Sequence, residues 1–223
     1  MNIFYLHEDP KICAQMHNDK HCVKMILEYA QLLSTAHRVL DGTEKIVEKY
    51  VHGSLPARWR KTKVWVLNDS REDVLYKATH ISHPSAVWVR RSYANYVWLH
   101  QLLRHLCVEY SYRYNRTHKV EESGLLLNLH VPPEKLLATR TTTMFSEPTP
   151  AMPDEYKVPG DSIASYRNYY VGAKRAMSRW TDRIMPDWFL EGINKQYDQA
   201  CFMTVNKRLG KVVSTSTQNM GQA

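Results

Sequence analysis

The stretch AQMHNDKHCVKMILEYAQLLSTAHR, residues 14–38, limits the possible folds more than any other part of the chain. On a helical wheel, apolar side chains cover most of its circumference, and polar ones share a sector of about 100°. That sector holds His17, Lys20, His21, Lys24, Glu28, Gln31, Thr35 and Arg38. A helix with so wide an apolar arc must be enclosed by other elements, so the pattern predicts a packed helical core.

The polar sector has two interpretations. It can face water, as in most amphipathic helices, or it can line a pocket. We expect a pocket, because histidines that titrate near neutral pH alternate here with lysines, and Glu28 follows Lys24 by one turn. Asp19 and His37 lie on the apolar side of the wheel, where a carboxylate must be paired. For Asp19 the sequence favours a cap, or a pair with an arginine of another helix, over catalysis.

Caps and breakers divide the rest of the chain. Asp9 and Pro10 begin the first helix, and Asp161 or Ser162 caps the last one. We expect an extended lead-in at 2–7, helices at 10–40, 64–79, 86–114 and 161–180, and a proline-rich loop at 139–160. The fold class is therefore mainly α, with one globular domain of long packed helices over residues 1–205. The polar segment 206–223 is expected to be a flexible tail.

The composition of the chain indicates its cellular compartment and the class of its binding partner. The net charge of +8 suits a polyanion such as nucleic acid. The four cysteines form no C-x-x-C pair, which argues against a zinc ribbon and suits a reducing compartment. No apolar run reaches the roughly 18 to 20 residues that a membrane helix needs. We expect a cytoplasmic protein that contacts no membrane and is a monomer.

Other residues expected to bind a substrate lie mostly on the aromatic-rich helix expected at 86–114 and just before its start. Arginine and asparagine beside tryptophan suit a phosphate and a base. The expected nucleic-acid or substrate-binding residues are Lys20, His83, Trp88, Arg91, Asn95, Trp98, Arg113, Arg167 and Lys174. Glu109 and Arg113 are one turn apart and are expected to pair at the helix edge. We expect Arg91, Asn95 and Arg113 to share the pocket of the first helix.

His17 and His21 have the i, i+4 spacing at which two imidazoles can share a metal. The glutamate of an H-E-x-x-H motif is absent, because Asn18 stands in that place. A third ligand would have to come from His7 or Asp19. We therefore expect neither a metal nor another cofactor.

With these residues in view, several stretches resemble a family of uncharacterised tailed-phage proteins; they include MNIFYLHEDPKICAQMH, VKMILEYAQLLSTAHRVLDG, THISHPSAVWVRRS and EYSYRYNRTHK. A phage origin implies the cytoplasm of the host cell. The first 42 residues also resemble the endonuclease V type of pyrimidine-dimer DNA glycosylase. That resemblance implies a nucleophilic amine on residue 2, exposed when Met1 is removed. Here residue 2 is Asn2, larger than methionine removal usually accepts, so Lys20 or Lys24 would have to replace that amine.

The favoured function is a DNA glycosylase/lyase, or another enzyme that processes a modified base, acting on a flipped nucleotide of duplex DNA. Lys24 would attack C1′ of the sugar, and Glu28 or Asp19 would stabilise the developing positive charge. His17 and His21 complete the expected catalytic set, and the flipped base would stack on Trp88 or Trp98.

Two other functions remain open. One is an enzyme that processes a nucleotide or a phosphate, with or without the help of a metal ion, and uses His17, His21 and Asp19. The other is a non-enzymatic module that binds nucleic acid or a host protein through its basic side chains. The sequence contains no P-loop, dinucleotide-binding or nucleophile-elbow motif that would favour another class of enzyme.

Overall fold

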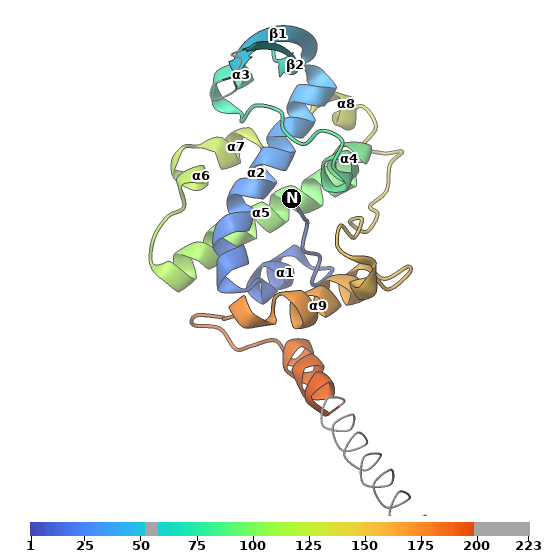
Figure 1. Cartoon of the computed structure of the whole chain (residues 1–223). Coiled ribbons are helices and arrows are strands. Elements are labelled where there is room, and N and C mark those ends of the chain that lie inside the picture. Colours follow the sequence, from blue (N-terminus) through green and yellow to red (C-terminus); the bar gives the residue numbers. More distant parts are fainter. Residues whose placement is uncertain (52–57, 199–223) are drawn as a thin grey trace, which may run out of the picture.

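The structure is a computed structural model that describes residues 1–51 and 58–198 (Figure 1). Its α-helices are α1 (Pro10–Met16), α2 (Asp19–Asp41), α3 (Arg71–Val74), α4 (Pro84–Arg91), α5 (Tyr93–Tyr114), α6 (Lys119–Glu122), α7 (Leu125–Asn128), α8 (Glu134–Leu137) and α9 (Ser162–Ala173). Residues 187–198 are also helical, and 3-10 turns span Asp154–Tyr156 and Arg175–Met177. The prediction of a mainly α fold is confirmed. The expected tail and its boundary at residue 206 lie outside the described residues.

The first long helix is interrupted, which the sequence analysis did not predict. α1 ends at His17, where the backbone turns to an extended conformation. Asn18 then caps α2, because its side chain accepts a hydrogen bond from the backbone N–H of His21 at 2.9 Å. The break resets the helical phase, so the wheel drawn across residues 12–40 groups side chains that point in different directions.

α2 and α5 pack against each other at the centre of the fold, and α1 packs on α5 (Figure 1). The lead-in at 2–7 is extended, as expected, and buries Ile3, Phe4 and Leu6 in the core. Its backbone is held by side chains, since the N–H of Phe4 donates to the Tyr29 hydroxyl at 3.1 Å. In Figure 1 the chain starts in front of α2 and α5 and beside α4.

A β-hairpin follows α2, where the sequence analysis expected an unpatterned segment and then a helix at 64–79. Strands β1 (Thr43–Val51) and β2 (Arg58–Val66) pair antiparallel, with Thr43 opposite Val66. The apolar and charged residues of TEKIVEKYV and RWRKTKVWV do not alternate regularly, so the sequence lacks the period-2 signal of a strand here. The expected helix is wrong except for α3, which covers only Arg71–Val74.

Buried Arg38 holds the base of this hairpin. Its guanidinium donates to the backbone oxygens of Trp65, Glu72, Leu75 and Tyr76 and to the Glu72 carboxylate, at 2.5–3.1 Å. The side chain is fully buried. Arg38 is therefore a structural residue, although the wheel placed it in the polar sector.

The aromatic-rich helix is also split, since Ser92 ends α4 and caps α5 by accepting from the N–H of Asn95 at 3.0 Å. The proline-rich segment 139–160 is a loop, as expected, apart from the short 3-10 turn. Asp161 caps α9, as predicted, but α9 ends at Ala173 and not near residue 180. Trp180 instead lies in the core, where its ring contacts Phe189.

Candidate functional site

The two histidines of the expected catalytic set are structural. The His17 ring bonds to the carbonyl oxygen of Cys13 at 2.8 Å and to the Tyr29 hydroxyl at 3.2 Å. His21 stacks on Phe4, with ring centroids 4.0 Å apart, and bonds to the Tyr170 hydroxyl at 2.6 Å. Burial lowers the pKa of His17 to about 4 and of His21 to about 2. Both rings are therefore neutral near pH 7 and are occupied by partners within the core.

Asp19 belongs to a buried ion network with Arg113, which confirms the predicted pairing with an arginine of another helix. Arg113 is fully buried, and donates to Asp19 at 3.0 Å and to Glu109 at 2.8 Å. Asp19 also accepts from the backbone N–H and the hydroxyl of Thr181. Glu109 accepts two further bonds from Arg183. Neither Asp19 nor Arg113 is free to meet a substrate.

The expected base-stacking tryptophans lie in the core. Trp88 is 1% exposed and donates to the backbone oxygen of Ser146, while Trp98 donates to that of Glu8. Asn95 is fully buried and exchanges hydrogen bonds with Ser146 at 2.9 and 3.1 Å. These three residues fix the proline-rich loop and the lead-in to α4 and α5. The expected pocket formed by Asn95, Arg91 and Arg113 with the first helix is therefore wrong.

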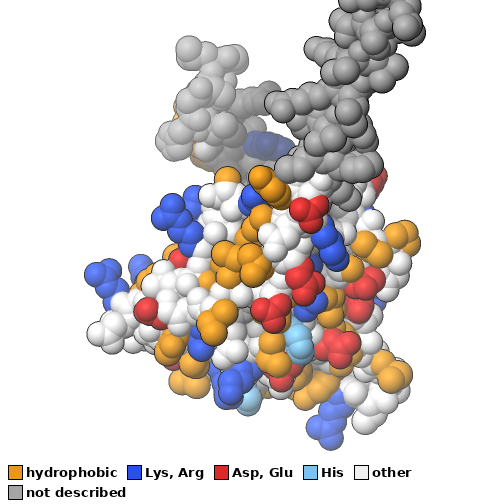
Figure 2. All heavy atoms as spheres, turned by 90° about the horizontal axis from the view of Figure 1, so that it is seen from below, with side chains coloured by type: hydrophobic (Ala, Val, Ile, Leu, Met, Phe, Trp, Pro, Cys, Tyr) orange, Lys and Arg blue, Asp and Glu red, His pale blue; other side chains and the backbone are white. Residues whose placement is uncertain are grey.

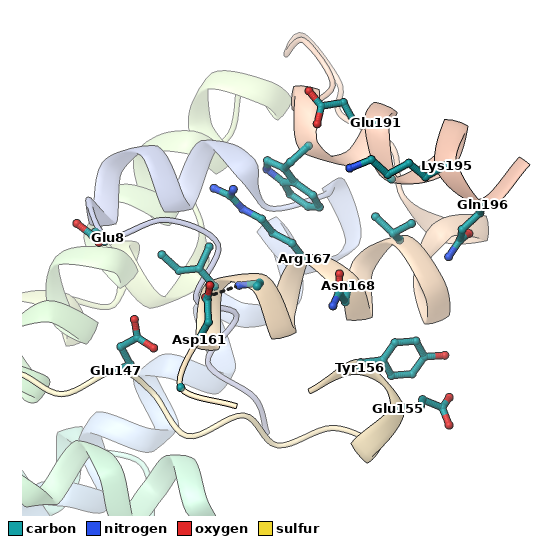
Figure 3. A pocket seen from close by; sticks show the side chains of 16 residues that line it. Glu8, Glu147, Glu155, Tyr156, Asp161, Arg167, Asn168, Glu191, Lys195 and Gln196 are labelled. Atoms are coloured by element: carbon teal, nitrogen blue, oxygen red, sulfur yellow. Dashed lines mark hydrogen bonds between the residues drawn. The ribbon is translucent and has the colours of Figure 1, made fainter. Parts of the chain in front are cut away.

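Arg167 borders a different cavity, of about 820 Å³, between α9 and the helix at 187–198 (Figure 3). Its guanidinium donates to the carbonyl oxygen of Leu6 and stacks over the Trp188 ring. Carboxylates surround the cavity, from Glu8, Glu147, Glu155, Asp161 and Glu191. Figure 2 views the end of the molecule where α9 lies and shows carboxylates across the middle of that face. The lining has five carboxylates against the two cations Arg167 and Lys195, so its charge disfavours a phosphate there.

Three of the remaining expected binding residues are dispersed. Lys174 follows α9 and lies over the Tyr169 ring at 4.6 Å. Arg91 is exposed at the last turn of α4. Lys20 is exposed in the first turn of α2, one turn before Lys24, so only Lys20 of these three is beside the cluster described next.

Glu28 forms the centre of the cluster that we consider the candidate site. Its carboxylate lies 3.0 Å from the Lys24 amine and 4.0 Å from the amino group of Met1. The Lys24 side chain is 70% exposed, the Glu28 side chain 15%, and the Met1 side chain 6%. One carboxylate at the surface therefore lies beside two amines, one in solvent and one at the edge of the core.

The start of α4 closes the other side of this cluster. Ser85 donates from its hydroxyl to the carbonyl oxygen of Met1 at 3.3 Å, which fixes the first residue against α4. His83 caps α4. Burial lowers the pKa of His83, the amino group of Met1 and His80 lower it further, and Glu28 opposes them. The Nδ1 atom of His83 accepts from the backbone N–H of Ser85 at 3.2 Å, so the ring is held at the start of α4.

Val23 and Leu27 are one turn apart on α2 and are each 41% exposed. They lie about 140° and 100° around the helix from Glu28, so they are not part of the site. His80, in the loop before α4, has φ of 48°, a left-handed conformation that costs a non-glycine residue energy and often occurs at functional sites. The arrangement offers two amines and one carboxylate, with the His83 imidazole at the start of α4.

Of the expected site residues, the structure brings Lys24, Glu28 and His83 together with Lys20 one turn away. The Met1 amine and His80 were not among the expected site residues. Their place depends on the path of the lead-in over α2, for which the sequence carries only the short, aromatic and β-prone character of residues 2–7.

No protein-family model, curated protein or solved structure matches the chain. Over residues 1–51 and 58–198, no group of three or more His, Cys, Asp or Glu side chains is arranged to hold a metal ion. Among the same residues, no helix has both the length and the apolar character needed to cross a membrane.

Proposed function

We propose that the protein excises or processes a base of DNA through an imine with the sugar, using an amine beside Glu28. The observation that carries the proposal is the Glu28 carboxylate, which lies 3.0 Å from Lys24 and 4.0 Å from the amino group of Met1. The resemblance of the first 42 residues to pyrimidine-dimer glycosylases supports it, because those enzymes place a charged helix beside a nucleophilic amine.

In the proposed reaction, a neutral amine attacks C1′ of the deoxyribose. The bond from C1′ to the base breaks, and the base leaves with the bonding electrons and one proton of the amine. The ring oxygen O4′ takes the second proton as its bond to C1′ opens, which leaves a C=N bond between the amine and C1′. Glu28 stabilises the positive charge that develops on the sugar.

The two amines differ in their fitness for attack. Lys24 is 70% exposed and pairs with Glu28, which suits it to bind a phosphate together with Lys20. The Met1 amine lies 4.0 Å from the same carboxylate, on a residue whose side chain is 6% exposed and whose carbonyl oxygen accepts from Ser85 of α4. We therefore favour the Met1 amine as nucleophile and Lys24 as anchor.

Borohydride trapping on duplex DNA with an abasic site tests the proposal, because reduction of the imine links protein and DNA covalently. We expect a trapped complex, and a rate 10²- to 10⁴-fold lower for Glu28→Gln, on the order seen when a catalytic acid or charge stabiliser is lost. Glu8→Gln, which removes an exposed carboxylate elsewhere, is the matched control and should react as the wild type does. Lys24→Arg keeps the charge and should still be trapped.

Trapping that is absent for the wild type, or equal for Glu28→Gln and wild type, would refute the proposal. Loss of trapping in Lys24→Arg with a normal melting temperature would instead assign the nucleophile to Lys24. A wild type that binds duplex DNA without any trapping would favour the non-enzymatic binding module.

A further inference from the structure

The hairpin β1–β2 concentrates the positive charge of the chain. Its 18 strand residues contain six lysines and arginines against two glutamates, a net charge of +4. The whole chain of 223 residues has a net charge of +8. Half of the excess therefore lies in one hairpin that the candidate site does not use.

The pairing register divides the hairpin into two unlike faces, because residues opposite each other point to the same side. One face holds Glu44, Ile46, Glu48, Tyr50, Trp59, Lys61, Lys63 and Trp65. Both glutamates of the hairpin are on this face, and Glu44 pairs with Lys63 at 2.8 Å. Here the lysines are balanced by carboxylates.

The opposite face has no carboxylate in either strand. It carries Lys45 and Arg60 with Val47, Thr62 and Val64. Both cations are exposed, and neither forms an ion pair with any residue that the structure describes. We call this the cationic face. Cations that no neighbouring carboxylate neutralises are available to phosphates.

The hairpin also exposes large apolar side chains on its balanced face. Ile46 is 65% and Trp59 is 67% exposed, and the Trp59 ring contacts that of Tyr50, with centroids 5.5 Å apart. These rings point away from the cationic face, so the contact with phosphates depends on Lys45 and Arg60. A two-stranded ribbon also has the width that fits the major groove of B-DNA.

A two-stranded hairpin is only marginally stable alone, so an arm of this kind needs an anchor. Arg38 supplies it by donating to the Trp65 carbonyl oxygen from the end of α2. Gly42 completes the junction, since a Cβ there would lie 2.4 Å from the Arg38 oxygen and 3.0 Å from the Val66 oxygen. The hairpin therefore continues from α2, the helix that carries Glu28 (Figure 1).

We infer that the hairpin is an arm that binds duplex DNA, with its cationic face on the phosphates. The choice of DNA rests on the proposed function, whereas the phosphate contact rests on the hairpin itself. Between Glu28 and the start of β1 at Thr43, the rise of α2 gives about 22 Å. That length corresponds to roughly six to seven base pairs of B-DNA, so arm and candidate site can engage one duplex.

Two charge-matched double variants test the inference with undamaged duplex DNA at several salt concentrations. Lys45→Gln with Arg60→Gln removes two cations from the cationic face, and Lys61→Gln with Lys63→Gln removes two from the balanced face. For the first variant we expect the slope of log affinity against log salt to fall by about 2, with a loss of affinity on the order of tenfold at low salt. The second should change the slope by less than about 1. Circular dichroism and melting temperature check that both are folded.

Equal losses in the two double variants would show a general charge effect and overturn the inference, as would no duplex binding by the wild type at low salt. A cationic-face effect larger on RNA than on duplex DNA would overturn the choice of partner. Glu28→Gln separates the two proposals, because it should keep full duplex affinity while losing trapping. A wild type that is never trapped, yet shows the cationic-face effect, refutes the proposed function and leaves the arm standing.

Discussion

Replacing Arg113 by methionine removes the centre of the buried ion network and keeps a side chain of similar length. Arg113 donates to the backbone oxygens of Gln15 and His17, on either side of the end of α1, as well as to Asp19 and Glu109. The two carbonyl oxygens lose a buried partner, at about 1–3 kcal/mol each. The carboxylates keep other donors, which limits the cost. We expect the free energy of unfolding to fall by roughly 3–5 kcal/mol, the usual range for a broken buried pair.

Urea unfolding followed by circular dichroism measures this loss. With a urea dependence of about 1–3 kcal/mol per molar, the midpoint should fall by at least about 1 M. Arg183→Met is the matched control, because Arg183 donates to the same Glu109 carboxylate from a partly exposed position. It should cost only about 1 kcal/mol. An Arg113→Met protein within 1 kcal/mol of the wild type would refute the view that this network holds α1, α2 and α5 together.

Two further changes of stability follow from buried groups. Burial lowers the pKa of both His17 and His37 to about 4, so the unfolded chain binds more protons between about pH 6.5 and pH 4, and stability should fall as the pH falls through that window. Each histidine contributes on the order of 3 kcal/mol to this loss in the free energy of unfolding. Urea midpoints at several pH values measure the loss. A His37→Gln protein with the same pH dependence as the wild type would contradict the prediction. Arg38→Lys cannot replace all five hydrogen bonds of the guanidinium and should lower the free energy of unfolding by about 2–4 kcal/mol. Hydrogen exchange should then accelerate at the base of the hairpin, and unchanged exchange there would contradict the anchoring role.

The sequence predicted the elements whose signals are local. The cap by Asp161, the extended lead-in and the proline-rich loop each depend on neighbouring residues, and the structure shows all three. The break at His17 and Asn18 has a local signal as well, since asparagine followed by aspartate suits a helix start. The apolar periodicity on both sides hid it, and the wheel then merged two helices of different phase.

The candidate site was only partly predictable, because burial depends on tertiary contacts. Lys24 and Glu28 are one turn apart, so their pairing follows from spacing. His21 lies one turn from Lys24, yet Tyr170, 149 residues away in the sequence, holds it in the core. The hairpin strands have no period-2 pattern, and their high charge made the segment resemble a solvated loop.

The site of the borohydride-trapped DNA on the chain tests the central claim most directly. After nuclease and protease digestion, mass spectrometry identifies the peptide that carries the reduced sugar. We predict the adduct on the amino group of Met1, within 4.0 Å of the Glu28 carboxylate. An adduct on a lysine remote from Glu28, such as Lys174, would contradict the assignment of this cluster as the reactive centre.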